Sequence, residues 1–526
     1  FSEKKLLSNT SPLSVANEDS CLRNTLSWSS MIDVTYKNAT HMVVKSETPH
    51  IVEEISKYFT IIIPDSQFMK RGHRKYWDGK LRLYNKRNST LYCGLLKNLI
   101  EFAKKRKYSL DIDDNLIPAD KWKEKDLDEF LRTLSLSMEL RDYQKKALIT
   151  CINKSRCVIE SSTGSGKSLV IYSLIRYLAE RKVILIVPTL TLISQMRSDF
   201  IKYSENDNWN FDENVHVITG GADKESDKSV FLSTWQSLYN LEKPYFEQFD
   251  SVIVDETHLA HSTSFRHILE NSTNADQRFG FTGTLQETQT HLMTILGLLG
   301  QATKVTNTKE LQKKKILSNI NIDMILLKYP EEICKRVVEL NYDEEIDVIL
   351  ENEKRNELIL NLAKKGSGNI LILTSQVEKS GLKLYDIINK EVCHKDVFFV
   401  HGETKKQLRE EIRWYAENND NVVIIATYQV FSTGVNIKNL QTILFAIAGK
   451  SKIRNLQSIG RGLRTHENKD HLKLIDIGDD FRYKNKVNYA FRHFEERYKL
   501  YISEGFPVNI NEKGIPCHPF VSMSND

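Results

Sequence analysis

Short apolar runs alternate with amphipathic stretches along most of the chain. Runs such as 157–159, 252–254 and 371–373 have the length of buried strands, and stretches with helical spacing of apolar residues follow them. Repeated strand–helix units of this kind favour parallel sheets with helices on both faces. The pattern therefore predicts an α/β fold built on parallel sheets.

The flanking segments depart from this pattern. Residues 1–30 are rich in Ser, Asn and Thr, so we expect either an upstream extension before a start at Met31 or a genuine disordered arm. Residues 31–115 mix strand and helix signals and predict a small α+β domain. A charged helical linker is expected at 116–137, and a C-terminal helix with a tail at 486–526.

Composition narrows the class of protein. A chain of 526 residues is too long for one hydrophobic core, and 40% hydrophobic with 27% charged residues is ordinary for a globular protein. No apolar run approaches the ~20 residues that span a bilayer, so no membrane segment is expected. Seven cysteines without a Cys-x-x-Cys pair argue against structural zinc and a disulfide framework. These features predict an intracellular protein.

Residues 161–168 have the composition of a phosphate-binding loop. They follow a short apolar strand and open an apolar helix, which is the setting in which backbone N–H groups and a helix N-terminus surround phosphates. Ser161 stands where the strict pattern has its first Gly. The segment predicts ATP binding, with Lys167 on the β/γ-phosphates and Ser168 on Mg²⁺. The expected ATP-binding residues of the loop are Thr163, Gly164, Ser165, Gly166, Lys167 and Ser168.

Two further segments supply the groups that hydrolysis needs. Asp255 and Glu256 end an apolar strand, where carboxylates face the ligand crevice of a parallel sheet. We expect Asp255 to hold Mg²⁺ and Glu256 to orient and deprotonate the attacking water. Arg461 and Arg464 lie one helical turn apart and suit an arginine-finger role, although such a segment in isolation is equally typical of a solvated basic turn.

Together these segments resemble the superfamily-two helicases over roughly residues 138–480. The resemblance implies two tandem RecA-like, parallel-sheet motor domains, at 138–310 and 311–485, with the first carrying the ATP-binding loop. It implies adenine recognition by Gln144 beside Arg141, and backbone contacts to nucleic acid by Thr189 and Thr234. It also implies that Thr282 and Thr284 link hydrolysis to strand movement.

The second half continues the resemblance in the same order. His401, Gly402 and Thr427 match positions that contact nucleic acid, Gly434 matches a nucleotide-binding position, and Gln457 opens the arginine-finger motif. Asn436 departs from the family, in which many members have Asp. The sequences Asp-Glu-Thr-His and Thr-Gly-Thr are similar to those of DNA motors rather than RNA helicases.

Basic charge is concentrated near the N-terminus. Between Lys70 and Lys107 there are thirteen Lys or Arg residues against two acids, whereas the whole chain carries only +5. Cations interleaved with aromatic rings suit phosphate contact and base stacking. The expected DNA-contacting residues are Lys70, Arg71, Arg74, Lys75 and Trp77. The alternative is that Trp77 anchors a hairpin core and the charges only aid solubility.

A basic block ahead of such a motor is similar to the arrangement in the phage UvsW helicases. That resemblance implies fork regression, branch migration and removal of RNA from R-loops, with DNA and RNA–DNA hybrids as partners and a bacterial host cytoplasm as location. The protein partners stay unknown. Two alternatives remain open: a restriction-system motor, and an ATP-gated sensor that does not separate strands. The C-terminal helix docks on the core or, through Arg492, Arg497 and Lys499, contacts DNA.

Overall fold

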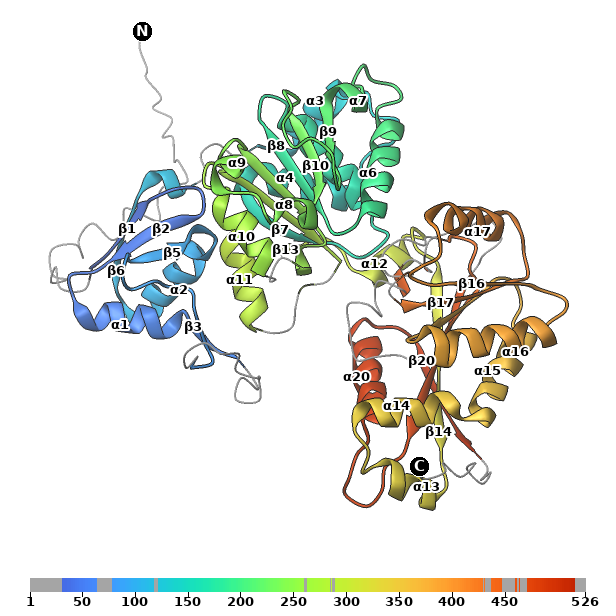
Figure 1. Ribbon diagram of the computed structural model, residues 1–526. Helices are drawn as coiled ribbons and strands as arrows, with labels where there is room; N and C mark the ends of the chain where they lie inside the picture. Colours follow the sequence, from blue (N-terminus) through green and yellow to red (C-terminus); the bar gives the residue numbers. More distant parts are fainter. Residues whose placement is uncertain are drawn as a thin grey trace, which may run out of the picture.

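The computed structural model describes residues 31–63, 78–117, 122–259, 263–283, 285, 289–428, 430, 437–446, 459–460, 463 and 471–515. Figure 1 shows an N-terminal domain, a first lobe and a second lobe that follow one another, with α12 (Thr308–Lys313) where the two lobes meet. Within the described residues, no helix is both long and apolar enough to cross a bilayer.

The first lobe is built on a parallel sheet in the order β13-β7-β12-β11-β8-β10-β9. Its fully buried strands read as continuous apolar runs because helices cover both faces. The strands are β7 (Arg156–Glu160), β8 (Val183–Val187), β9 (Val215–Ile218), β10 (Val230–Thr234), β11 (Ser251–Asp255), β12 (Gln277–Thr282) and β13 (Ala302–Lys304). The helices are α3 (Glu124–Thr133), α4 (Asp142–Lys154), α5 (Lys167–Tyr177), α6 (Leu190–Tyr203), α7 (Phe211–Asn214), α8 (Trp235–Leu238), α9 (Lys243–Glu247), η5 (Thr257–Leu259), α10 (Thr263–Asn271) and α11 (Gln289–Leu299).

The second lobe repeats this architecture with the strand order β16-β17-β15-β18-β19-β14-β20, again all parallel. The strands are β14 (Asn319–Lys328), β15 (Ile370–Thr374), β16 (Asp396–Val400), β17 (Val422–Thr427), β18 (Thr442–Phe445), β19 (His471–Asp480) and β20 (Val508–Gly514). The helices are α13 (Glu331–Val337), α14 (Tyr342–Glu351), α15 (Glu353–Lys365), η6 (Val377–Leu382), α16 (Lys383–Glu391), α17 (Lys406–Asn418) and α20 (Tyr489–Ser503). The expected pair of parallel-sheet domains is confirmed.

The N-terminal domain has a mixed sheet in the order β5-β2-β1-β6 and a separate β3–β4 hairpin. Its strands are β1 (Met31–Tyr36), β2 (His41–Lys45), β3 (Thr60–Ile62), β4 (Lys80–Arg82), β5 (Thr90–Tyr92) and β6 (Ser109–Ile112). Its helices are α1 (Pro49–Tyr58), η3 (Cys93–Leu95), α2 (Leu96–Arg106) and η4 (Asp114–Leu116). The predicted α+β character is present in these elements.

This domain shares one hydrophobic core with the first lobe. Buried residues of β1, β2 and α2 belong to the same cluster as those of β11, α10 and α11. The two surfaces meet closely, because a Cβ atom on Gly94 would overlap the carbonyl of Leu296, and one on Gly297 would lie 2.7 Å from Tyr92 Cδ2. The N-terminal domain and the first lobe are therefore one packed unit.

A fully buried arginine joins the two halves of this unit. The guanidinium of Arg278 on β12 donates to Thr40 Oγ1 at 2.7 Å, to the carbonyl of Ala275 at 2.9 Å and to that of Leu269 at 3.0 Å. Burial lowers the pKa of Arg278 to about 9. Because a buried cation is costly unless its N–H groups are satisfied, Thr40 and the lobe carbonyls are held in fixed positions around it.

The C-terminal segment belongs to the second lobe. Helix α20 buries Phe491, Phe494 and Tyr501 against the sheet, as its apolar spacing predicts. The following strand β20 pairs with β14, which the sequence pattern did not indicate. The helix expected in the linker at 116–137 is present as α3, and its Leu127 joins the core of the first lobe.

Arg497 is part of the core rather than of a DNA-contacting surface. It is 2% exposed and pairs with Asp476, with Nε–Oδ2 and Nη2–Oδ1 distances of 2.8 Å. The hydroxyl of Tyr501 donates to the same carboxylate at 2.8 Å. The alternative interpretation of α20 is therefore wrong for Arg497, whereas Arg492 and Lys499 are exposed.

We expect Arg497→Met to lower the stability of the protein by about 3–5 kcal/mol, because it leaves the buried Asp476 without its cation. Lys499→Ala, on the exposed face of the same helix, should change stability by less than about 0.5 kcal/mol. Urea unfolding followed by intrinsic fluorescence measures both. Equal midpoints for the two variants would contradict a structural role for the buried pair.

Candidate nucleotide-binding site

The loop at 161–166 connects β7 to the N-terminus of α5. Gly164 and Gly166 have φ values of +83° and +78°, a left-handed conformation that side chains disfavour. Alternation of such residues with ordinary ones turns successive backbone N–H groups toward one concave side and forms an anion-binding nest. The loop therefore has the backbone geometry for binding phosphates at the start of α5.

Ser161 stands in place of the first glycine of the loop, and its side chain forms a hydrogen bond within the loop. Ser161 is 4% exposed, and its Oγ donates to Ser165 Oγ at 2.7 Å. Its backbone N–H donates to the carbonyl of Thr282 at 2.9 Å. The departure from the strict pattern thus preserves the loop and ties it to β12.

Lys167 and Ser168 occupy the first turn of α5. Lys167 Nζ donates to the carbonyl of Ser161 at 3.3 Å, so the ammonium folds back over the loop. The hydroxyl of Ser168 lies 2.9 Å from that of Tyr203 on α6. Both side chains lie beside the loop, and their contacts with phosphate and Mg²⁺ stay predictions.

Residues at the start of α4 form hydrogen bonds with the backbone carbonyls of the loop. Gln144 is 3% exposed, and its Nε2 donates to the carbonyls of Ser165 at 3.0 Å and Gly166 at 3.1 Å. Its Oε1 accepts from the N–H of Arg141 at 2.8 Å, and the Tyr143 hydroxyl donates to the Ser165 carbonyl at 2.9 Å. Gln144 therefore braces the loop in this structure, and its adenine contact stays a prediction.

Asp255 and Glu256 lie at the carboxyl end of β11. Asp255 is 5% exposed, and within the described part of the chain its Oδ1 has no hydrogen-bond partner. Burial, and then the charge of Glu256, raise the pKa of Asp255 to about 7, while Lys167 opposes this shift. Glu256 has φ of +52°, which is uncommon for a residue with a side chain and marks local strain at the site.

Thr282 lies between the loop and the carboxylates. Strand β12 separates β7 from β11, and the Thr282 hydroxyl is 3.2 Å from Nδ1 of His258. The same nitrogen of His258 is 3.3 Å from Glu256 Oε2. A continuous set of contacts therefore runs from Glu256 through His258 to Thr282 and on to Ser161.

The expected nucleic-acid contacts lie at the ends of strands in both lobes. Thr189 caps α6 by accepting from the N–H of Leu192 at 3.3 Å, and Thr234 Oγ1 lies 3.1 Å from Ser237 Oγ. Thr427 ends β17, and His401 and Gly402 follow β16. A side chain added to Gly402 would meet nothing within 4 Å, so this turn is open.

The second lobe approaches the loop directly. A Cβ atom on Gly460 would lie 2.5 Å from Thr163 Cβ, and one on Gly164 would lie 2.9 Å from Leu317 Cδ2. A small cavity at this junction is lined by Ser162, Thr163, Gly283, Thr308, Ile459, Gly460, Leu463, Glu504 and Phe506. The segment that immediately precedes Arg461 therefore lies against the phosphate loop.

Several predicted residues lie outside the described residues. They are Thr284, Gly434, Gln457, Arg461 and Arg464 around the nucleotide, and Lys70, Arg71, Arg74, Lys75 and Trp77 in the N-terminal domain. Their roles stay predictions.

Sequence reasoning missed three residues that help to build the site. His258 ends the quoted Asp-Glu-Thr-His motif and Tyr143 adjoins Gln144, so both stood next to recognised positions. Tyr203 carried no signal, because its contact with Ser168 spans 35 residues of sequence.

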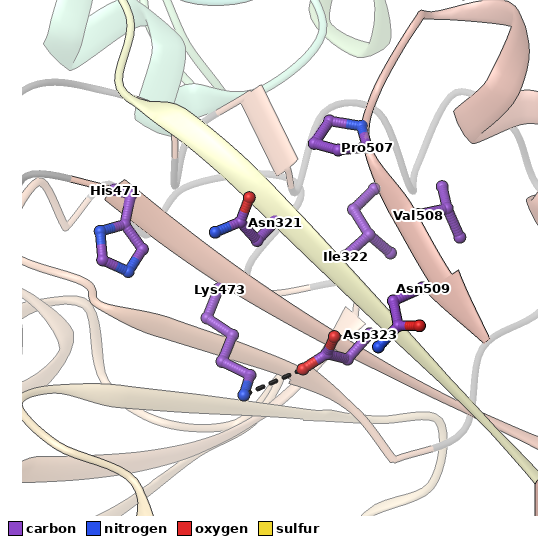
Figure 2. A pocket seen from close by; sticks show the side chains of 8 residues that line it. All are labelled: Asn321, Ile322, Asp323, His471, Lys473, Pro507, Val508 and Asn509. Atoms are coloured by element: carbon purple, nitrogen blue, oxygen red, sulfur yellow. Dashed lines mark ion pairs between the residues drawn. The ribbon is translucent and has the colours of Figure 1, made fainter. Parts of the chain in front are cut away.

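A wider cavity of about 390 Å³ lies on the second lobe, away from this site. Figure 2 shows it lined by the first residues of β14 and β19 and by the segment that leads into β20. Lys473 Nζ is 2.9 Å from Asp323 Oδ2, so these opposite charges compensate each other inside the cavity. We assign no ligand to it.

Two family models match the chain. Residues 137–287 match the model described as type III restriction enzyme, res subunit, and residues 353–466 match the helicase conserved C-terminal domain. The first match spans the strands that carry the loop and the carboxylates, and the second spans β15 to β18.

Similar solved structures include two of broad coverage. The crystal structure of T4 UvsW is 28% identical to this chain in sequence. The match covers 92% of this chain and 99% of the T4 UvsW chain, with a TM-score of 0.49. A fragment of a putative HsdR subunit of a type I restriction enzyme from Vibrio vulnificus has a TM-score of 0.55 at 16% identity, with 85% and 89% coverage. The second likeness shows the fold alone.

The ATP-dependent DNA helicase uvsW of Enterobacteria phage T4 is 31% identical over 500 residues, which are 90% of this chain and 98% of that helicase. A match over 90% of this chain is longer than the two lobes alone, so the likeness includes the N-terminal domain as well. This chain therefore belongs to the UvsW family of ATP-dependent DNA helicases, within helicase superfamily two.

Proposed function

We propose that this helicase remodels branched DNA, by fork regression, junction migration and removal of RNA from R-loops. The observation that carries the proposal is the shared core of the N-terminal domain and the first lobe. A basic domain fixed rigidly to the lobe that binds ATP grips one DNA arm while the two lobes step along a strand. The named relative comes from a bacteriophage, which supports a bacterial cytoplasm as the place of action.

The proposed hydrolysis uses groups from both lobes. Lys167 binds the β/γ-phosphates, and Glu256 orients and deprotonates water. Arg461 and Arg464 stabilise the charge that develops on the γ-phosphate, and the position of Gly460 beside Thr163 supports this role.

Ser168 and Asp255 fit a bound Mg²⁺. The buried Asp255 Oδ1 lacks a hydrogen-bond partner within the described residues, and burial together with the charge of Glu256 raises the pKa of Asp255, so a cation bound there would stabilise its charged form. A hard divalent cation prefers such oxygen ligands. When bound there, Mg²⁺ supplies charge neutralisation to the phosphates.

Strand movement follows from contacts with the sugar–phosphate backbone. Thr189 and Thr234 hold it in the first lobe, and Thr427 with the His401–Gly402 turn holds it in the second. Opening and closing of the lobes around ATP changes the spacing of the two sets of contacts, and each cycle thereby advances the motor.

A restriction-system motor is the second candidate. It is favoured by the match of residues 137–287 to the restriction res-subunit model. That match lies within the first lobe and its flanks, which both classes of motor use. Cleavage of plasmid DNA by the purified chain would favour this candidate.

The proposal is tested by ATP hydrolysis and strand separation on single strands, duplex, forks, four-way junctions and R-loops. The wild type should open forks and junctions faster than plain duplex. Glu256→Gln should bind ATP and fork DNA but open none, because the general base is removed while the geometry is kept. Hydrolysis stimulated by DNA without any strand separation would instead identify an ATP-gated sensor.

We expect Asp255→Asn to abolish hydrolysis yet raise the melting temperature of the metal-free protein at pH 8. A pKa raised to about 7 means that the charged carboxylate is unfavourable in the fold, so this group's contribution to stability is lost as pH rises through 7. The amide removes that charge. Calorimetry at pH 5.5 and 8 measures the effect, and a lowered melting temperature at pH 8 would contradict it.

A further inference from the structure

A second polar cavity lies on the seam between the N-terminal domain and the first lobe. Its volume is about 290 Å³, close to the lower end of the range of about 300–1,000 Å³ for small-ligand sites. Its lining comes from the β1–β2 turn, the β4–β5 region and α10. The polar lining residues that matter here are Lys37, Arg82, Asn85, Asn88, Arg266 and Glu270.

Cations outnumber acids on these walls. Glu270 is already compensated, because it accepts from Arg266 Nε at 2.8 Å and from the Tyr92 hydroxyl. Lys37 is exposed, and its ammonium has no partner among the residues that the structure describes. Arg82 pairs with Asp78, but both side chains are about half exposed, and solvent weakens ion pairs at such positions. An incoming anion competes readily for it.

His41 does not add to this charge. Burial lowers its pKa to about 4, so the ring is neutral at pH 7. Its imidazole stacks near Tyr92, with ring centroids 4.9 Å apart, and forms a polar but uncharged part of the wall. The site is therefore suited to an anionic group, with Lys37 as the principal cation, amides beside it, and Arg266 sharing its guanidinium between Glu270 and the cavity.

The cavity is rigid and adjoins the predicted track of the nucleic acid. The hydrogen bond from Arg278 to Thr40, and that from Arg156 Nη2 to the Ala39 carbonyl at 2.9 Å, fix the two walls relative to each other. Phe265, which precedes Arg266, packs against Trp235 with ring centroids 6.3 Å apart. Trp235 directly follows Thr234, one of the proposed backbone contacts.

We propose that this seam binds a backbone phosphodiester of the DNA arm held by the N-terminal domain, through Lys37 and Arg266. The inference rests on the proposed function. It identifies the place where DNA bound by the N-terminal domain also contacts the first lobe. The arm continues from Thr234 past α10 into the seam. Because α10 follows η5, and η5 follows Asp255 and Glu256, the seam is connected through one short segment to the hydrolytic residues.

The test measures binding of fluorescein-labelled fork DNA by anisotropy over a series of salt concentrations. Lys37→Ala should reduce the slope of log affinity against log salt by about 0.9, and Lys37→Ala with Arg266→Gln by about 1.8, because each cation that neutralises a phosphate displaces condensed counterions. Lys57→Ala removes an exposed cation from α1 of the same domain, outside the basic stretch between Lys70 and Lys107, and should leave the slope unchanged. Melting temperatures confirm that the variants fold.

Three outcomes would overturn the proposal. If both variants that carry Lys37→Ala show the same salt slope as the wild type, the DNA arm binds elsewhere. The proposed function would still stand if the wild type opens forks. Equal reductions in slope for Lys37→Ala and Lys57→Ala show only a diffuse basic surface. The third outcome is that inorganic phosphate, at matched ionic strength, raises the melting temperature of the wild type but not that of Lys37→Ala, while the salt dependence of DNA binding is the same for both. The seam then binds free anions rather than DNA. Failure of the proposed function would differ, since the wild type would then open no branched substrate.

Discussion

The position of β12 between β7 and β11 is the constraint on which the rest of the site depends. The loop that binds phosphate follows β7, and the carboxylates follow β11, so any mechanical link between them passes through the end of β12. Thr282 makes this link with its carbonyl to Ser161 and its hydroxyl to His258. Strand β12 packs closely against the segment after β11, because a Cβ atom on Gly280 would lie only 2.7 Å from Thr257 Oγ1. A shift at the carboxylates therefore moves β12.

The same strand reaches the N-terminal domain at its other end. Arg278 begins the buried part of β12 and donates to Thr40 across the seam. Its charge is stabilised in the core only while Thr40 and the surrounding carbonyls stay in place, which makes the domain and the first lobe move together. The phosphate loop, the carboxylate pair and the N-terminal domain thus share one strand, β12, as their common contact.

Local signals in the sequence carried much of this architecture. The phosphate loop, the Asp-Glu pair and the apolar strands were predictable because each depends on a few consecutive residues. The replacement of glycine by Ser161 did not hide the loop, since the strand before it and the helix after it kept their patterns. The basic charge of the N-terminal domain was also visible as composition.

Features made by distant residues were not predictable in this way. Strand order, the pairing of β20 with β14, and the shared core depend on packing between segments far apart in sequence. Helical spacing places Arg497 on the buried face of α20, between Phe494 and Tyr501, but its pairing with Asp476 comes from a separate strand and no local pattern shows it. The contacts of Gln144 with two carbonyls of the phosphate loop join residues more than twenty positions apart, and no local pattern shows them.

The most direct test of the account is the number of ATP molecules hydrolysed per fork opened in Thr282→Val. Valine keeps the shape of threonine but removes the hydroxyl that contacts His258, so the link through β12 is weakened while the hydrolytic groups stay in place. We predict that DNA-stimulated hydrolysis stays near the wild-type rate and that the ATP consumed per fork rises several-fold. An unchanged ratio of hydrolysis to unwinding would contradict the role of β12 as the coupling element.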